Sequence, residues 1–438
     1  MRQMKDSGVE WIENIPSDWT IVPLKWIVKF GKGLPITKDN LVEQGVPVVS
    51  YGQIHSKTNS GTHLGKDLMR FVNEKYFQSN PSSLGKKGDI FFADTSEDYA
   101  GVGNAVLVDE DEPVFAGYHT VIVRPIDLLY SKYLAYLFLT DAWRSQLCSR
   151  VSGIKVFSVT QGLLKETTVI LPPTEKIATM TDYLDRKCAE IDAIIAKQQH
   201  IIEKLKEYKL SVITEAVTKG LNPNVPMKDS GVEWIGKIPE HWKIIKMKFL
   251  GKTRNGLTYS PEDLRDETDG ILVLRSANIQ NGKLDFTDKI YVSCPVKDEL
   301  MVKKGDILIC SRNGSRKLIG KNVIINTDIS ASFGAFMMIF RTPYNSEYIR
   351  YILNSDVFSY YLGTFLTSTI NQLTRNNFDN MVIPFTFNNE EQKYLVMYLK
   401  NRCDKIDELI RNKQVEIETL YKYKKSLIYE VVTGKMEV

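Results

Sequence analysis

The sequence has few of the residues that build metal centres and disulfide frameworks. It contains five cysteines and five histidines in 438 residues. None of the cysteines lies in a CxxC pair, and their odd number does not suit a set of disulfides, so we expect reduced thiols in a cytoplasmic protein. The histidines are scattered without the spacing of metal ligands, which predicts no metal site in this chain.

Long apolar runs are also missing. None approaches the roughly 18–20 residues that span a bilayer, and the charged N-terminal stretch is unlike a signal peptide, so we expect no membrane contact. The net charge of +4 is too small to indicate a nucleic-acid partner by itself. Hydrophobic content of 43% is ordinary for a globular protein, and the chain length predicts two or more domains.

Motifs for catalysis are absent as well. The sequence has no Gly-x-Ser-x-Gly or HExxH pattern, and it lacks the Asn/Asp-Pro-Pro-Tyr/Phe tetrapeptide of amino-methyltransferases. The stretch GSRKLIGKN (Gly314–Asn322) departs from a phosphate-binding loop, because its glycines lie one residue too far apart and Asn322 replaces Ser or Thr. We therefore predict that this chain has no catalytic centre.

What the sequence does contain is an internal repeat. The nine residues MKDSGVEWI occur at Met4–Ile12 and again at Met227–Ile235, 227 − 4 = 223 positions later. Further along, KKGDIFFADTSE (Lys86–Glu97) parallels KKGDILICSRNG (Lys303–Gly314). Such matches in the same order predict one structural unit that is written twice in the chain.

The end of each repeat has the pattern of a long helix. YLDRKCAEID (Tyr183–Asp192) answers YLKNRCDKID (Tyr398–Asp407), and apolar residues recur there every seven positions. Sustained seven-residue spacing with a charged outer face predicts two long helices that pair as a coiled coil within one chain. The polar residues Gln198 and Lys413 interrupt the apolar seam near its middle, a device that can fix its register.

These features predict four segments: a repeated N-segment with a globular domain (residues 1–173), the first long helix (174–219), a linker, second N-segment and second domain (220–387), and the second long helix with the tail (388–438). The linker GLNPNVP (Gly220–Pro226) cannot continue a helix. Short β-branched runs such as HTVIVRP predict strands in the globular regions, and SKYLAYLFL predicts a helix. The predicted fold is α+β (mixed α/β): two globular α/β domains joined by two long coiled-coil helices, with an internal repeat.

The loops of the globular regions differ between the repeats where the frame is kept. Arg and Lys can contact phosphates or guanine, and Asn and Gln can contact adenine, so polar loop residues at matched places are candidate DNA contacts. A solvated surface loop is the alternative for any one of them. The candidates of the first repeat are Ser50, Tyr51, Gln53, His55, Lys57, Thr95, Ser96, Tyr99, Asn104 and Lys155. The candidates of the second repeat are Arg275, Ser276, Asn278, Gln280, Lys283, Ser311, Arg312, Asn313, Arg316, Lys317, Asn371, Gln372 and Arg375.

A second group of candidates belongs to the scaffold or to a partner-docking surface. The tryptophans of the two N-segments could dock a partner or pack within the chain, and both readings stay open. The seam residues of the long helices should lie between the helices. These candidates are Trp11, Trp19, Trp234, Trp242, Leu184, Ile191, Leu399 and Ile406.

Taken in order, these motifs resemble the specificity subunit of type I DNA restriction–modification systems across essentially the whole chain. The resemblance rests on MKDSGVEWIGKIPEHW and its first copy, on ILPPTEKIATMTDYLDRKCAEID leading into a long helix, and on its echo VIPFTFNNEEQKYLVMYLKNRCDKID. One departure is that the second helix opens without the double proline present at Pro172–Pro173.

The resemblance implies a non-catalytic subunit that reads double-stranded DNA. Each globular region would be a target-recognition domain for one half of a bipartite site. The two long helices would run antiparallel, with the two repeats related by a pseudo-twofold, and would set the gap. The implied partners are two methylation subunits and motor–nuclease (restriction) subunits. S-adenosylmethionine, ATP and Mg²⁺ would belong to those partners, with no cofactor in this chain. Two other functions remain open: a free-standing bipartite DNA-binding regulator, and a coiled-coil scaffold whose variable domains bind protein.

Overall fold

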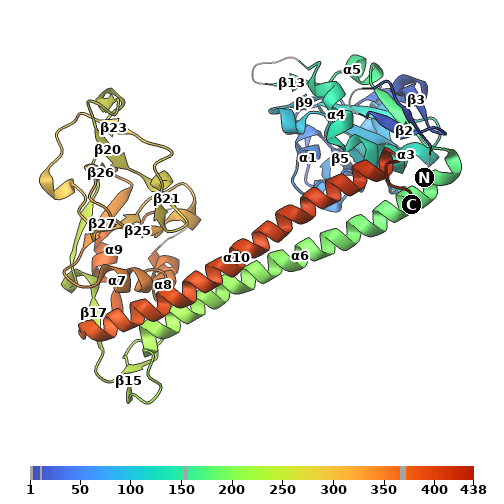
Figure 1. The fold of residues 1–438 in the computed structure, drawn as a ribbon. Coiled ribbons are helices and arrows are strands. Elements are labelled where there is room, and N and C mark those ends of the chain that lie inside the picture. The colour runs from blue at the N-terminus through green and yellow to red at the C-terminus, as the bar shows by residue number, and fades with distance from the viewer. Residues whose placement is uncertain (1–2, 10–11, 152–155, 366–370) are drawn as a thin grey trace. The chain divides into compact units, whose positions relative to one another are not determined.

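The computed structural model describes residues 3–9, 12–151, 156–365 and 371–438. The chain forms two compact units, one of Met1–Gln198 with Val415–Val438 and the other of Gln199–Gln414. Each unit therefore holds one globular repeat together with a part of each long helix. The two long helices, α6 (Thr174–Lys219) in green and α10 (Asn389–Val432) in red, are each drawn unbroken in Figure 1.

The first unit contains short strands and helices that precede α6. Its strands are β1 (Met4–Asp6), β2 (Asn14–Pro16), β3 (Thr20–Pro23), β4 (Val28–Lys32), β5 (Val46–Val49), β6 (Arg70–Val72), β7 (Leu84–Gly85), β8 (Ile90–Ala93), β9 (Thr95–Ser96), β10 (Ala105–Leu107), β11 (Val114–Ala116), β12 (Thr120–Pro125), β13 (Phe157–Ser158) and β14 (Thr168–Leu171). Its helices are α1 (Tyr51–Ile54), α2 (Tyr76–Ser79), α3 (Leu129–Phe138), α4 (Asp141–Cys148) and α5 (Gln161–Lys165).

Two four-stranded sheets form the centre of this unit. One is antiparallel with the order β10-β8-β12-β4, and the other has the order β6-β5-β11-β7 with β5 and β11 parallel. The strand β8, with sequence IFFA, is buried along its whole length, as a strand in the middle of a covered sheet should be. The predicted strand HTVIVRP forms β12, between β8 and β4.

The second unit has a similar arrangement, but its elements have different bounds and its sheets differ at their edges. Its strands are β15 (Met227–Asp229), β16 (Lys237–Pro239), β17 (Lys243–Lys246), β18 (Lys252–Asn255), β19 (Leu264–Arg265), β20 (Ile271–Leu274), β21 (Ile279–Gln280), β22 (Lys283–Leu284), β23 (Tyr291–Val292), β24 (Ile307–Cys310), β25 (Asn322–Ile324), β26 (Ala331–Phe333), β27 (Met337–Arg341) and β28 (Val382–Phe385). Its helices besides the long ones are α7 (Ser346–Ile352), α8 (Asp356–Phe365) and α9 (Arg375–Asn380).

The sheets of the second unit correspond to those of the first. The antiparallel sheet has the order β18-β27-β24-β25, and the mixed sheet has the order β19-β23-β20-β26 with β20 and β26 parallel. Strands β18, β27 and β24 thus take the places of β4, β12 and β8. The antiparallel sheets of the two units therefore share one strand order. The mixed sheets share their parallel pair but differ in the outer strand, since β7 pairs with β11 in the first unit and β19 pairs with β23 in the second.

The ends of the long helices are set by identifiable capping residues. Helix α6 follows Pro172–Pro173 and ends at Gly220, whose φ of 72° is the left-handed conformation that closes helices. Helix α10 has no proline before it. Instead, the side-chain oxygen of Asn388 accepts hydrogen bonds from the backbone N–H groups of Glu390 and Glu391, at 3.0 and 3.2 Å. The side chain of Asn388 therefore caps the start of α10, where the double proline that precedes α6 is missing.

Parts of both long helices enter the core of each unit. In the first unit, Leu184 and Ile191 of α6 are buried in one apolar cluster with Leu427 and Val431 of α10. In the second unit, Leu399 of α10 lies in the same cluster as Ile213 and Val217 of α6. Because each unit needs both helices to complete its core, the compact units cut across the four segments that we expected along the sequence.

Candidate nucleic-acid interface

Each unit is built on the same buried ion pair. Asp89, at the start of β8, receives two hydrogen bonds from Arg124 of β12 at 2.7 and 2.6 Å, and Asp306 receives the same pair of bonds from Arg341 at 2.7 and 2.6 Å. Both carboxylates are only 1% exposed. The bond to the aspartate raises the pKa of each arginine further, so both guanidinium groups stay charged. The repeated KKGD motif is thus a structural clamp, which fixes one end of the sheet.

The opposite end of the same strands carries a backbone junction that is also repeated. Asp94 follows β8; its N–H donates to His119 O at 3.1 Å, and its carbonyl accepts from Val159 N at 2.7 Å. Ser311 follows β24; its N–H donates to Phe336 O at 2.9 Å, and its carbonyl accepts from Leu373 N at 2.8 Å. The backbone is therefore the same in both units at a place where the side chains differ.

Three predicted residues of the first repeat meet beside this junction. The His55 ring lies at the end of α1, with Nε2 2.7 Å from Thr95 O and Nδ1 3.0 Å from the Asn104 side-chain nitrogen. Since Thr95 of β9 and Asn104 both lie in the segment between β8 and β10, these contacts fix α1 against that segment. Tyr51, on α1, places the edge of its ring near that of His55, with centroids 6.2 Å apart.

His119 is the most prominent residue of this cluster. It precedes β12 with a φ of 54°, a left-handed conformation that is uncommon outside glycine. Its Nδ1 lies 3.2 Å from Asp94 Oδ1, its ring centroid lies 5.3 Å from that of Tyr51, and its side chain is 57% exposed. Partial burial and the neighbouring Tyr51 raise the pKa of Tyr118 beside it. The imidazole of His119 is thus solvent-exposed, on a turn before β12 where Asp94 and Tyr51 contact it.

The second unit presents a different surface at the matched turn. Phe336 stands where His119 does, since 336 − 119 = 217 is the offset that also relates Asp306 to Asp89, 306 − 89 = 217. The Phe336 ring is 58% exposed, and the Arg312 guanidinium lies 5.2 Å from its centroid. The Asn313 amide nitrogen donates to Ser276 Oγ at 3.2 Å, which joins two predicted loops.

Other predicted residues lie on the surface around these clusters. Arg312 forms an isolated antiparallel bridge with Gln372. Arg275 is paired with Asp288 at 2.6 Å, and Arg375 with Asp379 at 3.2 Å, so part of the predicted positive charge is neutralised within the unit. The Tyr99 ring packs on Phe157 at 4.2 Å and is still 57% exposed. Of the remaining predicted residues, Asn371 is half-buried and the exposed ones are Lys57, Gln280, Lys283, Arg316 and Lys317. Lys155 lies outside the described residues.

The structure corrects several predicted DNA contacts. Asn278 is fully buried: its oxygen caps the turn by accepting from Arg275 N at 2.8 Å, and its nitrogen donates to the carbonyls of Asp285 and Asp288. Gln53 makes the equivalent bond to Ser50 N at 3.2 Å and is only half-buried. The buried serines have side chains that cannot reach a groove from where they lie: Ser50, Ser96 and Ser311.

The tryptophans and the helix seam serve the scaffold within each unit. Trp19 and Trp242 are buried, and the Trp242 indole N–H donates to Glu391 at 3.0 Å. Trp234 stacks on Tyr360 of α8 at 4.4 Å. Leu184, Ile191, Leu399 and Ile406 are all buried. Trp11 lies outside the described residues.

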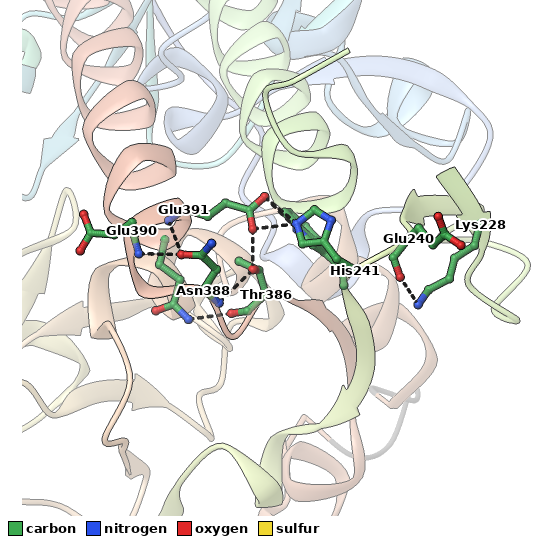
Figure 2. A network of polar contacts seen from close by, with 9 residues as sticks. Lys228, Glu240, His241, Thr386, Asn388, Glu390 and Glu391 are labelled. Carbon is green, nitrogen blue, oxygen red and sulfur yellow. Dashed lines mark hydrogen bonds and ion pairs between the residues drawn. The ribbon is translucent and has the colours of Figure 1, made fainter. Parts of the chain in front are cut away.

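Figure 2 shows how the second N-segment is attached to the start of α10. Glu391 is the centre of this network: its carboxylate lies 3.0 Å from His241 Nε2 and accepts from Thr386 Oγ1. In the same view Lys228 of β15 reaches the Glu240 carbonyl, which closes the segment on itself. The matched pair in the first unit is Asp18 with Lys176, at 2.8 Å. The contact between the N-segment and the long helix is therefore kept in both units. The acidic residue lies on the N-segment in the first unit (Asp18) and on the long helix in the second (Glu391).

Among the described residues, one group has the geometry to hold a metal ion: His63, Asp109 and Glu110. Asp109 is already bonded within the protein, to His63 Nδ1 at 2.6 Å and to Leu64 N at 2.9 Å. These protein contacts account for the arrangement. No helix in the described part of the chain has both the length and the apolar character needed to cross a membrane.

The sequence matches a known family model over part of its length. Residues 16–212 match the model of the family described as type I restriction modification DNA specificity domain. This match confirms the resemblance drawn from the repeated motifs.

Comparison with individual proteins extends over the whole chain. The chain is 24% identical to the type I restriction enzyme MjaVIII specificity subunit of Methanocaldococcus jannaschii, covering 97% of this chain and 94% of that protein. It is 27% identical to the type I restriction enzyme EcoKI specificity subunit of Escherichia coli, covering 70% of this chain and 64% of that protein. A chain from a solved structure on complex assembly and conformational transition of the type I R-M system shares the fold, with a TM-score of 0.64, 19% identity, and coverage of 96% of this chain and 99% of that one.

Proposed function

We propose that this chain is the DNA-recognition subunit of a type I restriction–modification complex. Each unit would read one half of a bipartite site in double-stranded DNA. The observation that carries the proposal is the repeated junction: the same backbone hydrogen bonds at Asp94 and Ser311 display His119 in one unit and Phe336 in the other. Two equal frames with unequal exposed side chains suit two different half-sites.

The chemistry of the two surfaces supports a nucleic-acid target. Arginine can bond guanine in the major groove or phosphates, and histidine, asparagine and tyrosine can bond base edges. Arg312, Arg316 and Lys317 are exposed beside the second junction. The first surface depends more on neutral and imidazole groups, since Asp94 lies at its centre. The two half-sites should therefore differ in sequence and in the salt dependence of their contacts.

The long helices and the repeat suggest how the larger complex is organised. We infer that α6 and α10 set the separation of the two half-sites and that the two units each take one methylation subunit. Motor–nuclease subunits would join the same assembly. S-adenosylmethionine, ATP and Mg²⁺ would be bound by those partners, which would also carry the adenine methylation and DNA cleavage chemistry.

The test is co-expression with the methylation subunit encoded by the neighbouring gene, followed by purification and sequencing of modified bases in the host DNA. The expected result is a stable complex and methylated adenine in both halves of one split motif. DNA affinity of the purified complex should fall log-linearly with salt concentration. The chain alone should bind the same site weakly.

Two outcomes would overturn the proposal. Sequence-specific binding that is equally tight in the absence and in the presence of the partner would point to a free-standing regulator. A stable complex with no modified base and no salt-dependent DNA binding would point to a scaffold whose domains bind protein.

A further inference from the structure

Both units expose a large aromatic side chain at the same place in the repeat. Trp26 ends a short 3-10 turn (Leu24–Trp26) in the first unit, and Phe249 ends the matching turn (Met247–Phe249) in the second. They are equivalent, since 249 − 26 = 223 is also the offset of the two N-segments, 227 − 4 = 223. Each side chain is 66% exposed.

The turn beneath each aromatic residue is firmly anchored. Leu24 and Met247 are fully buried, and their N–H groups donate to Thr167 O at 2.9 Å and Met381 O at 3.0 Å. The exposed ring is therefore presented on a rigid base in both units. Trp is among the residues that most often dominate the binding energy of a protein–protein contact, and Phe is enriched with Trp in the cores of such interfaces.

In the first unit, further exposed apolar residues follow β12 close to the turn that carries Trp26. After β12, Ile126 N donates to Ile27 O at 2.8 Å, and Ile126 and Leu128 are each 62% exposed. After β27, the Thr342 hydroxyl donates to Leu250 O at 2.7 Å, close to Phe249. We call these surfaces the edge patches: Trp26, Ile126 and Leu128 in the first unit, and Phe249 in the second. Exposed lysines, including Lys25, Lys29, Lys246, Lys248 and Lys252, flank them.

The edge patches lie at the opposite end of the sheet from the DNA-reading junctions. Strand β4 pairs Val28 with Pro125, the last residue of β12, whereas His119 precedes the first residue of β12. In the second unit β18 pairs Lys252 with Arg341, the last residue of β27, and Phe336 precedes β27. The length of β12 places roughly 20 Å between the two ends, at about 3.3 Å per residue.

We propose that the two edge patches are the docking sites for two copies of one protein partner, the methylation subunit. The inference rests on the proposed function. Two equivalent patches in one chain match two copies of one partner, and apolar side chains with a lysine rim suit an apolar protein surface edged by carboxylates. The flanking lysines can also contact phosphates, but Ile126 and Leu128 offer a phosphate no hydrogen bond and the reading junctions lie at the opposite end of the sheet, so a protein surface is the occupant we propose.

The experiment compares the wild-type chain with Trp26→Glu, Phe249→Glu and the double variant, each co-purified with the methylation subunit and weighed by native mass spectrometry. Wild type should bind two copies. Each single variant should bind one, with affinity at the altered site at least about tenfold weaker, and the double variant should bind none. Trp26→Phe should retain two copies, because an aromatic side chain is kept.

Matched controls replace exposed aromatic residues at the other end of each unit. Tyr99→Glu and Phe336→Glu change side chains that are 57% and 58% exposed, so they should leave the stoichiometry at two in the absence of DNA. Unchanged thermal unfolding of the free chain shows that each variant folds.

The outcomes separate the inference from the proposed function. If the wild-type chain binds no methylation subunit, the proposed function fails. If wild type binds two and the double variant also binds two, the docking inference fails. If the double variant binds two but the complex loses its DNA affinity, the edge patches contact DNA and the inference is overturned in favour of that ligand.

Discussion

The carboxylate of Asp192 on α6 accepts two hydrogen bonds from the Lys424 ammonium on α10, both at 2.7 Å. In the other unit the Asp407 carboxylate accepts two from Lys209, at 2.7 and 2.6 Å. The repeat relates the two pairs, because 407 − 192 = 215 and 424 − 209 = 215. Each helix thus supplies the acid in one unit and the base in the other, which requires an antiparallel pairing within each unit.

The first prediction exchanges these charges. Asp192→Lys places two ammonium groups together and should lower the thermal unfolding midpoint of the first unit by about 2–4 °C, since a partly exposed pair of this kind is worth at most about 1 kcal/mol. Adding Lys424→Asp should restore most of the loss. Adding Lys209→Asp should not, because Lys209 faces Asp407. Equal rescue by both second changes would contradict the pairing.

The second prediction concerns the buried clamp. Arg341→Met leaves the Asp306 carboxylate buried without its charged partner, which should destabilise the second unit by about 3–5 kcal/mol. Calorimetry should then show the second unit melting well before the first. The control is Glu299→Gln, which breaks the more exposed ion pair of Arg254 and Glu299 and should cost less than about 1 kcal/mol. Similar costs for both changes would show that the clamp is not a structural element.

The third prediction is a pH dependence at Cys403. Burial raises the pKa of this thiol from the ordinary value of 9.0 to about 11. The folded state therefore holds the proton more tightly than the unfolded chain, so the stabilisation is complete below pH 9 and is lost as the pH rises through 11. The difference in unfolding free energy between wild type and Cys403→Ala should narrow over that range. Cys294→Ala, at a half-buried thiol, should show a smaller change.

The fourth prediction separates the two reading surfaces. His119→Phe should alter the preferred bases in one half-site only, and Phe336→His should alter only the other, each by about 10–100-fold in relative affinity for the affected base. Binding of the complex to DNA with one half-site randomised would measure this. Tyr423→Phe, at an exposed position on α10, is the control and should change neither half. A shift in both halves from one substitution would contradict one domain per half-site.

The scaffold was predictable from sequence because it is governed by periodicity and by local signals. The seven-residue spacing identified Leu184 and Leu399 as buried, and both lie in the cores. The run of β-branched residues in HTVIVRP identified β12. The helix start without a double proline was explained only by the structure, since the cap is a single asparagine side chain, Asn388.

The candidate site was harder to predict because a polar loop residue can face either the ligand or its own backbone. Asn278 and Gln53 occupy matched places and resemble base-reading amides in sequence, yet both cap a turn. His119 and Phe336 were not predicted as DNA contacts. Each directly precedes a strand, and the sequence pattern there indicates only the strand. Aligning the repeats at KKGD with the constant offset brings the two residues together and would have identified them as a divergent pair on a constant frame.

The last prediction tests whether the long helices set the gap between half-sites. Both helices continue from one unit into the other, and each unit holds one of the two ion pairs, so an insertion in α6 alone would shift the two helices relative to one another at one of these pairs. Seven residues should therefore be inserted in both helices, after Gln198 and after Gln414, which keeps the apolar seam in phase. The insertion adds roughly 10 Å, at 1.5 Å per residue, which corresponds to about three base pairs of DNA.

The expected result is a methylated motif with the same two half-sites and a gap longer by about three base pairs. A four-residue insertion in both helices is the control, because it shifts the seam and should lower the unfolding midpoint and the yield of complex. An unchanged gap in the seven-residue variant would show that the separation of the half-sites is fixed by the bound methylation subunits, with the helices serving only to hold the two units in one chain.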